Sequence, residues 1–495
     1  MSARTAVRAA LLAATSMLAA CAAGPNFKTP PPPAATRYTR HSLANPVATA
    51  GVPGGGGQTF ETGATISGDW WTLFHSPALD ALVTAALKNN HDLKAAQAAL
   101  QVAHEDVLAQ RGSFLPAVSA GFGASRQRDP SAALAPVPSN NASEYSLFTP
   151  QLTISYAPDL FGLNRRTRES LEAQEQAARF QMIAAWTTLG SNVVVTAVQE
   201  ASLRAQVDAT RDLIGLEKHS LAILELRFRK GDASKLDVSA EQSQLAQTET
   251  GLPALVKQLA ATRHALAVLV GAFPDRSPAE TFTLADLHLP ERLPVSLPSK
   301  LVAQRPDVRQ ARANLHAASA AIGIAAAQRL PNLQLTADAG STALAISKVF
   351  TSGTGFWGIA ASLTAPIFEG GQLMHQERAA KAAYVEAAEQ YRGTVLTAFQ
   401  NVADTLVALD QDAQALHAAA EAQQAAKTAL DLSQLQLKHG YIGTFELLAA
   451  QQAYQQARIA LVQAEANRFA DTAALYQALG GGWWHHKKLA DDEHE

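Results

Sequence analysis

The pattern of apolar positions is dominated by one long helical stretch. From Gln372 to His439 the chain has no proline and only one glycine, Gly393. Apolar side chains recur there every seven residues, at Val402, Leu409, Leu416, Leu430 and Leu437. The one polar residue in this series is Gln423. A helix over this stretch would be roughly 100 Å long. Because a narrow seven-residue stripe is typical of a helix that packs on other long helices, the pattern predicts a bundle or tube of long antiparallel helices.

The long stretch has a counterpart 209 residues earlier in the chain. The same seven-residue pattern is carried there by Val207, Ile214, Leu221 and Phe228. The match continues past the helix without an insertion and pairs Gly231 with Gly440 and Gly271 with Gly480. The chain is therefore predicted to be an internal duplication of units of roughly 190 residues, a period much longer than that of solenoid repeats.

After the opening helix of each unit, the period of the apolar pattern changes from 3.6 to 2. The alternating segments lie at residues 118–124, 152–156, 333–339 and 357–363. They predict four strands of about ten residues, the length of a membrane-spanning strand. Four strands are too few to close a barrel, and an open sheet edge is not tolerated in lipid, so strands in a membrane would have to be pooled by several chains. The alternative is a small soluble sheet packed on the helices.

Composition narrows the classes of function. Charged residues make up 17% of the chain and the net charge is −3, which gives no sign of a nucleic-acid partner. No hydrolase, phosphate-loop or metalloprotease motif is present, so an enzyme is not predicted. The pair His485-His486 and the acidic residues near the C-terminus have no spacing fixed by a helix or turn, which favours a disordered tail over a metal site. Neither a metal nor a diffusible cofactor is expected.

The N-terminus has the layout of an export signal. Arg4 and Arg8 precede an apolar run that begins at Ala9 and is too short to span a membrane as a helix. The run ends in Leu18-Ala19-Ala20-Cys21, and Cys21 is the only cysteine of the chain. This ending resembles the bacterial lipobox, which implies a covalent lipid on Cys21, diacylglycerol plus an N-acyl chain. By the same resemblance, Ala22 in place of Asp favours sorting to the outer membrane. The alternative is a chance cysteine in an ordinary signal.

These observations divide the chain into six predicted segments. They are a signal peptide (1–20), a lipidated N-terminus with a Pro/Gly-rich linker that has no fold of its own (21–68), a first repeat unit (69–271), a proline-rich linker (272–299), a second repeat unit (300–482) and a disordered tail (483–495). Each repeat unit is predicted to contain, in order, a helix, a strand, a loop, a strand, a long helix, a turn and a returning helix.

Several short motifs, in order along the chain, resemble the TolC-like outer-membrane efflux protein family and its OprM/NodT lipoprotein branch. The motifs are the lipobox with Gly24-Pro25-Asn26-Phe27, then Trp70-Trp71, Arg305-Pro306-Asp307-Val308, Pro366-Ile367-Phe368-Glu369-Gly370-Gly371 and Leu479-Gly480-Gly481-Gly482-Trp483. The resemblance covers nearly the whole chain after the signal.

The resemblance implies a mainly α fold with transmembrane β-strands. A homotrimer would pool four strands per chain into a 12-stranded β-barrel in the outer membrane, and the duplicated long antiparallel helices would form an α-barrel in the periplasm. It also implies an exit duct of a tripartite efflux system, with a periplasmic adaptor (membrane fusion) protein and an inner-membrane pump, expected to be proton-driven, as partners. Two alternatives remain open: the exit duct of a type I protein-secretion system, and a non-conducting envelope scaffold lipoprotein.

In the family, the turns at the ends of the long helical hairpins dock the adaptor and close the channel. Carried over by position, the candidate docking residues are Arg229, Gly231, Asp232, Lys438, Gly440 and Gly443. The candidate gate residues are Asp237 and Glu446, each six residues after its turn glycine. The alternative is helix capping, because Ser234-x-x-Asp237 has the form of a capping box and Glu446 would lie in the first turn of a helix. The chain departs from the branch pattern at Ala449 and Ile442, so the resemblance leaves open how the gate closes.

Overall fold

The computed structural model describes residues 22–40, 45–128, 144–278, 282–486 and 489 of the 495-residue chain. The chain forms two compact units. The first comprises Met1–Thr29, Leu100–Ala177 and Ala311–Tyr391, and the second comprises Pro30–Ala99, Ala178–Gln310 and Arg392–Glu495. Each sequence repeat contributes to both units, so the repeats are not separate domains.

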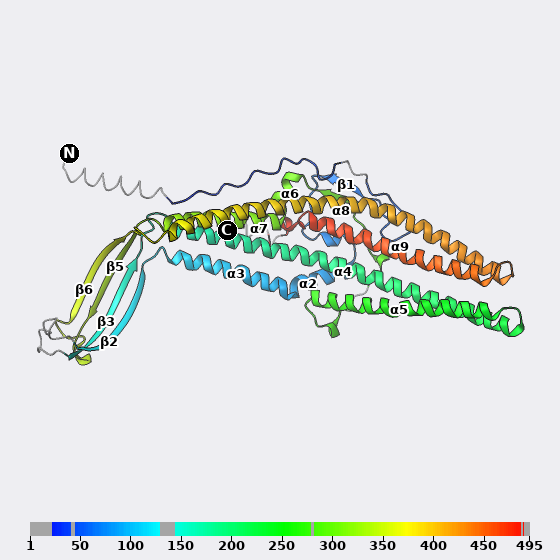
Figure 1. Ribbon diagram of the computed structural model, residues 1–495, viewed down its shortest axis with the longest axis horizontal. Helices are drawn as coiled ribbons and strands as arrows, with labels where there is room; N and C mark the ends of the chain where they lie inside the picture. The colour runs from blue at the N-terminus through cyan, green and yellow to red at the C-terminus, as the bar shows by residue number, and fades with distance from the viewer. Residues whose placement is uncertain (1–21, 41–44, 129–143, 279–281, 487–488, 490–495) are drawn as a thin grey trace. The chain divides into compact units, whose positions relative to one another are not determined.

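Two long helical hairpins confirm the main prediction from the apolar pattern. The first consists of α4 (Leu163–Lys230) and α5 (Lys235–Leu269), and the second of α8 (Gln372–Lys438) and α9 (Thr444–Ala478). In each hairpin the shorter helix folds back along the longer one (Figure 1). The two long helices begin 209 residues apart, at the offset expected from the duplication.

The turns of the two hairpins repeat the same backbone hydrogen bonds. The N–H of Asp232 donates to the carbonyl of Arg227 at 2.8 Å, and the N–H of Tyr441 donates to the carbonyl of Gln436 at 2.9 Å. Gly231 in the first turn and Gly440 in the second adopt φ values of 83° and 76°, in the left-handed region that favours glycine. The duplication therefore extends to the geometry of the hairpin ends.

Shorter helices open each repeat. They are α2 (Pro77–Asn89) and α3 (His91–Gly112) in the first repeat, and α6 (Pro298–Gln304) and α7 (Pro306–Ala327) in the second. One face of α2 is apolar and buried, at Leu79, Leu82, Val83 and Ala86. The described residues also form the 3₁₀ helices η1 (Trp70–Phe74), η2 (Pro274–Arg276), η3 (Leu284–Asp286), η4 (Ile346–Lys348) and η5 (Trp483–His485). In the part of the chain that the structure describes, no helix combines the length and the hydropathy needed to cross a membrane.

The four predicted strands are confirmed and form one antiparallel sheet in the first unit. The strands are β2 (Ala117–Arg128), β3 (Glu144–Tyr156), β5 (Asn332–Ser341) and β6 (Gly355–Thr364), in the order β2-β3-β5-β6 (Figure 1). The second and third strands of this order come from different repeats, so the sheet joins the two halves of the duplication.

The register of the sheet separates apolar from polar side chains. One cross-strand row reads Val118, Ile154, Ala337 and Ile359, and the next row reads Ser119, Thr153, Asp338 and Gly358. Since successive residues of a strand point to opposite faces, one face of the sheet is apolar and the other is polar. The apolar face is open in the single chain, where Trp357 and Ile359 are each 79% exposed.

The prediction that the first linker has no fold of its own is wrong for part of it. Within the linkers 21–68 and 272–299, β1 (Thr59–Thr62) and β4 (Arg292–Val295) pair as a two-stranded parallel sheet. A four-residue strand is too short to show a period of 2, and Pro294 lies within β4, so the local pattern did not indicate either strand.

The prediction of a disordered tail from residue 483 is also wrong at its start. Trp483 is only 1% exposed, and its indole N–H donates to the carbonyl of Gln304 at 2.7 Å. The guanidinium of Arg309 lies over the Trp483 ring, 5.4 Å from its centroid. Nδ1 of His485 lies 2.6 Å from the carbonyl of Ile66. Residues 487–488 and 490–495, including the acidic candidates for a metal site, lie outside the described residues.

A buried arginine attaches the N-terminal linker to the second unit. The side chain of Arg468, on α9, is 0% exposed. It donates to the carbonyl oxygens of Gly54 at 3.3 Å, Gly56 at 3.1 Å and Leu409 at 3.0 Å. The linker is therefore fixed to α8 and α9 at this point and is not a free tether.

Candidate functional site

The first described residues pack at the junction between β3 and α4. Cys21 itself lies outside the described residues. The N–H of Ala23 donates to the carbonyl of Phe161 at 2.9 Å, and a Cβ added to Gly162 would come within 2.8 Å of Ala22. The chain that follows the predicted lipidation site is therefore held where the sheet ends and the long helix begins.

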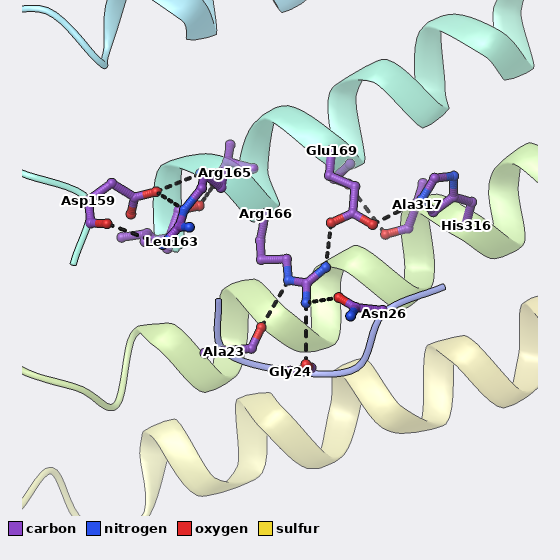
Figure 2. Close-up of polar contacts among 12 residues, drawn as sticks. Ala23, Gly24, Asn26, Asp159, Leu163, Arg165, Arg166, Glu169, His316 and Ala317 are labelled. Atoms are coloured by element: carbon purple, nitrogen blue, oxygen red, sulfur yellow. Dashed lines mark hydrogen bonds and ion pairs between the residues drawn. The ribbon is translucent and has the colours of Figure 1, made fainter. Parts of the chain in front are cut away.

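Arg166 holds this segment in place. Its Nε donates to the carbonyl of Ala23 at 3.0 Å, and its Nη2 donates to the carbonyl of Gly24 at 3.3 Å and to Oδ1 of Asn26 at 2.8 Å (Figure 2). Its Nη1 forms an ion pair with Glu169 at 2.6 Å. Because the Arg166 side chain is buried, these contacts are shielded from water and fix the backbone after residue 22.

Glu169 links Arg166 to α7. Its second carboxylate oxygen lies 3.0 Å from Nε2 of His316, whose ring stacks on Phe27 with centroids 4.4 Å apart. Burial alone would raise the pKa of Glu169, but the hydrogen bonds from Arg166 and His316 outweigh it and lower the pKa below its ordinary value. We call residues 22–27 with Arg166, Glu169 and His316 the N-terminal clamp.

Asp159 places Arg166 by capping the start of α4. Its carboxylate accepts hydrogen bonds from the backbone N–H groups of Asn164 at 3.1 Å and Arg165 at 3.0 Å (Figure 2). An aspartate that accepts from free N–H groups at a helix start also complements the positive end of the helix dipole.

At the first hairpin end, the candidate gate residue Asp237 is engaged as a helix cap. The N–H of Ser234 donates to Oδ2 of Asp237 at 2.9 Å, and the N–H of Asp237 donates to Oγ of Ser234 at 3.1 Å. The hydrogen bonds from Ser234 lower the pKa of Asp237, and the Thr444 hydroxyl at the start of α9 adds to this effect. The predicted capping box is therefore confirmed, and Asp237 is charged at neutral pH.

At the second hairpin end, Glu446 lies in the first turn of α9, after the N-cap residue Gly443. A Cβ added to Gly443 would meet the Glu446 carboxylate at 3.0 Å. Both candidate gate residues are therefore in the first turns of returning helices. A gating role for either residue remains a prediction.

A cavity of about 880 Å³ opens between the two hairpin ends. Its lining includes the candidate docking residues Asp232, Lys438 and Gly440 but not Arg229, Gly231 or Gly443. The apolar part of the lining consists of Leu216, Ile223, Leu224, Leu437 and Leu447. Basic side chains in the lining include Arg227, His219 and His439. A concave, partly apolar surface with a polar margin is suited to binding another protein element.

Comparison with known proteins agrees with this architecture. Residues 82–272 and 297–481 match the family described as outer membrane efflux protein. The pyoverdine export outer membrane protein OpmQ of Pseudomonas putida is 32% identical over 419 residues, which are 84% of this chain and 88% of that protein. The toluene efflux pump outer membrane protein TtgC of Pseudomonas putida is 30% identical over 472 residues, 94% of each chain. The Campylobacter jejuni CmeC outer membrane channel has the same fold, with a TM-score of 0.85 at 22% identity over 96% of this chain and 98% of that one.

Proposed function

The chain belongs to the outer membrane efflux protein family, and from this premise we propose that it is the exit duct of a tripartite pump for small toxic compounds. Members of the family are transport channels of the outer membrane. The proposal is that this chain works with a periplasmic adaptor and an inner-membrane pump, expected to be proton-driven, and carries out no chemistry of its own.

The two-faced sheet is the observation that carries the proposal. A sheet of a soluble protein buries its apolar face, whereas here Trp357, Ile359 and Leu363 leave the apolar face of β6 exposed. The opposite face carries Ser119, Thr153 and Asp338 across neighbouring strands. Apolar side chains facing lipid and polar side chains facing water are the arrangement of a strand at a channel wall.

The same sheet requires further chains. Among the described residues its edge strands β2 and β6 have no neighbour on their outer sides, and unpaired backbone groups are not tolerated in lipid. The hairpins also leave apolar side chains exposed in one chain, at Leu226, Phe228, Leu236, Leu432, Leu435 and Phe445. We propose that three copies pair their sheets into one twelve-stranded barrel and cover these side chains with each other's hairpins.

A lipid on Cys21 fits this arrangement. Ala22 is fixed beside Gly162, where β3 ends and α4 begins. A lipid attached to the preceding residue would enter the membrane at the level at which the strands leave it. The proposed diacylglycerol and N-acyl groups would then act together with the sheet as membrane anchors.

The first experiment is single-channel recording of the purified full-length protein in planar lipid bilayers. A homotrimeric duct is expected to give discrete conductance steps, because its water-filled barrel would carry ions. A non-conducting scaffold lipoprotein would give none, and that result would overturn the proposed function.

Removing the acidic charge at the hairpin ends is expected to increase ion leak. In the double variant Asp237→Asn with Glu446→Gln, the Asn side chain can still accept the Ser234 N–H bond, so the cap is kept while both charges are lost. If these acids close the pore, conductance or the open fraction should rise several-fold at about 0.15 M salt. The double variant Asp237→Ala with Glu446→Ala removes both charges and also the hydrogen bond from Ser234 that caps α5. Unchanged conductance in both double variants would reject the gating role.

A further inference from the structure

Two glutamates are buried together just inside the first hairpin end. Glu217, on α4, and Glu241, on the second turn of α5, are each 0% exposed within a single chain. Gln451, on α9, is likewise 0% exposed and faces Glu241. The cluster therefore lies where the first hairpin packs against the start of the returning helix of the second.

The hydrogen bonds of this cluster are incomplete. Oε1 of Glu217 accepts from the hydroxyl of Thr248 at 3.0 Å and from the amide of Gln244 at 3.4 Å. Within the described parts of the chain, Oε2 of Glu217 and both carboxylate oxygens of Glu241 find no hydrogen-bond partner of ordinary geometry. The amide of Gln451 donates to Ser220 at 3.4 Å, and its Oε1 is also without a partner. A protonated Glu241 would supply the donor that these buried oxygens lack.

No cation among the described residues balances the two carboxyl groups. From α4 the charged group that faces Glu241 is Glu217, and from α9 the group is the neutral amide of Gln451. A further charge that acts on Glu217 is that of Glu249, which is also acidic and forms an ion pair with Lys218 at 2.8 Å. Two ionised carboxylates in this place would be an uncompensated buried charge pair, which proteins avoid by keeping one proton.

We propose that Glu217 and Glu241 hold one proton between them, and that loss of this proton loosens the packing of α5 against α4 and α9 at the hairpin ends. With the proton present, the pair carries a single negative charge, and the protonated carboxyl group can donate a hydrogen bond. Without it, repulsion and the desolvation of the second charge favour separation of the helices and entry of water. The consequence for pore opening rests on the proposed function, whereas the loosening itself does not.

The pH range follows from the burial of Glu241. Burial, with the Glu217 charge adding to it, raises the pKa of Glu241 to about 7, although the Gln451 amide opposes the rise. A carboxyl group whose pKa is raised by folding stabilises the packed state below its ordinary pKa of about 4.5 and loses this contribution as pH rises to about 7. Between pH 6 and pH 8 the opening equilibrium of the cluster should shift about tenfold.

The second repeat shows which residues stand at the positions equivalent to Glu217 and Glu241. At the offset of 209 residues, Glu217 corresponds to Ala426 and Glu241 corresponds to Ala450, so the second repeat carries neither acid. The acidic pair is therefore a feature of the first hairpin alone. In the second repeat, α8 forms with Ala426 at the position of Glu217, and α9 forms with Ala450 at the position of Glu241.

The test is hydrogen–deuterium exchange of the purified full-length protein at pH 6 and pH 8, with the rates corrected for the pH dependence of chemical exchange. Peptides from residues 235–248 and 444–455 should lose protection about tenfold between the two pH values. The variant Glu241→Gln should abolish the change, and Glu241→Ala, which copies the second repeat, should do the same if Gln packs poorly. The control Glu421→Gln, an exposed glutamate on α8 that is not part of the cluster, should behave as wild type.

Equal corrected protection at both pH values in the wild type would overturn the proposal, and so would a full pH response in both Glu241 variants. Bilayer recordings at the same two pH values test the link to the pore, where a larger open fraction is expected at pH 8. A change in exchange without a change in conductance would support the proton site and overturn its link to opening.

Discussion

Replacing Arg468 with Met is expected to destabilise the second unit by about 3–5 kcal/mol. The substitution leaves the carbonyl oxygens of Gly54, Gly56 and Leu409 without their donor in a buried site. It also removes the positive charge near Asp412. Burial and the Asp471 carboxyl group raise the pKa of Asp412, and the Arg468 charge opposes this rise. Breaking a buried charge site on one side is costly because the remaining polar groups stay desolvated.

Urea unfolding of the purified protein, followed by circular dichroism, measures this loss, and proteolysis around residues 54–57 reports release of the linker. The matched control is Arg458→Met on the same helix, where the partially exposed Arg458 pairs with the exposed Asp212 at 3.3 Å. A pair of this kind contributes less than about 1 kcal/mol. Similar losses in the two variants would contradict the role given to Arg468.

Replacing Gly24 with Ala is expected to release the N-terminal clamp. Gly24 has a φ of 84°, and a Cβ added there would lie 2.4 Å from Cα of Gly323 on α7. A left-handed conformation costs a residue with a side chain about 1–2 kcal/mol, and the contact with backbone atoms adds to this because a backbone cannot rotate away. Arg166→Leu should have the same effect by a different route, since it removes three of the donors that hold residues 22–27.

Hydrogen exchange of residues 22–30 measures release of the clamp, and a loss of protection of at least about tenfold is expected, because 1.4 kcal/mol corresponds to one factor of ten. The control Gly51→Ala has a similar φ, 81°, but nothing within 4 Å of the added Cβ. Full protection of the N-terminal segment in both Gly24→Ala and Arg166→Leu would show that the clamp does not fix it.

The long helices and the sheet could be predicted from the sequence because their signals are local. The seven-residue stripe and the alternation over about ten residues each extend far enough to be recognised. The stripe alone could not tell which neighbour covers it. Val402 and Leu409 are buried within one chain, whereas Phe228, in the same register of the other repeat, is exposed. An apolar stripe indicates that another helix covers it, but it does not indicate whether that helix belongs to the same chain.

The sequence was less informative about contacts between distant segments. Arg166 and Arg468 look like ordinary polar positions on helices, and only tertiary packing buries them. The same holds for Glu217 and Glu241, which are charged positions on long helices and are buried only by tertiary packing. The hairpin-end residues were carried over by position from the family resemblance, with Gly231 and Gly440 marking the two turns, and the structure gives Asp237 a capping role there.

The central claim, that this chain is the exit duct of a tripartite pump, is tested most directly by site-specific photo-crosslinking in living cells. A photoreactive residue is placed at Lys235 or Tyr441, which are exposed beside the two turns, and a control is placed at the exposed Val268, at the other end of α5. Captured proteins are identified by mass spectrometry. The account predicts capture of the adaptor of a proton-driven efflux pump from both turns and not from Val268. Capture of an adaptor from an ATP-driven protein-secretion system, or of no adaptor from either turn, would contradict it.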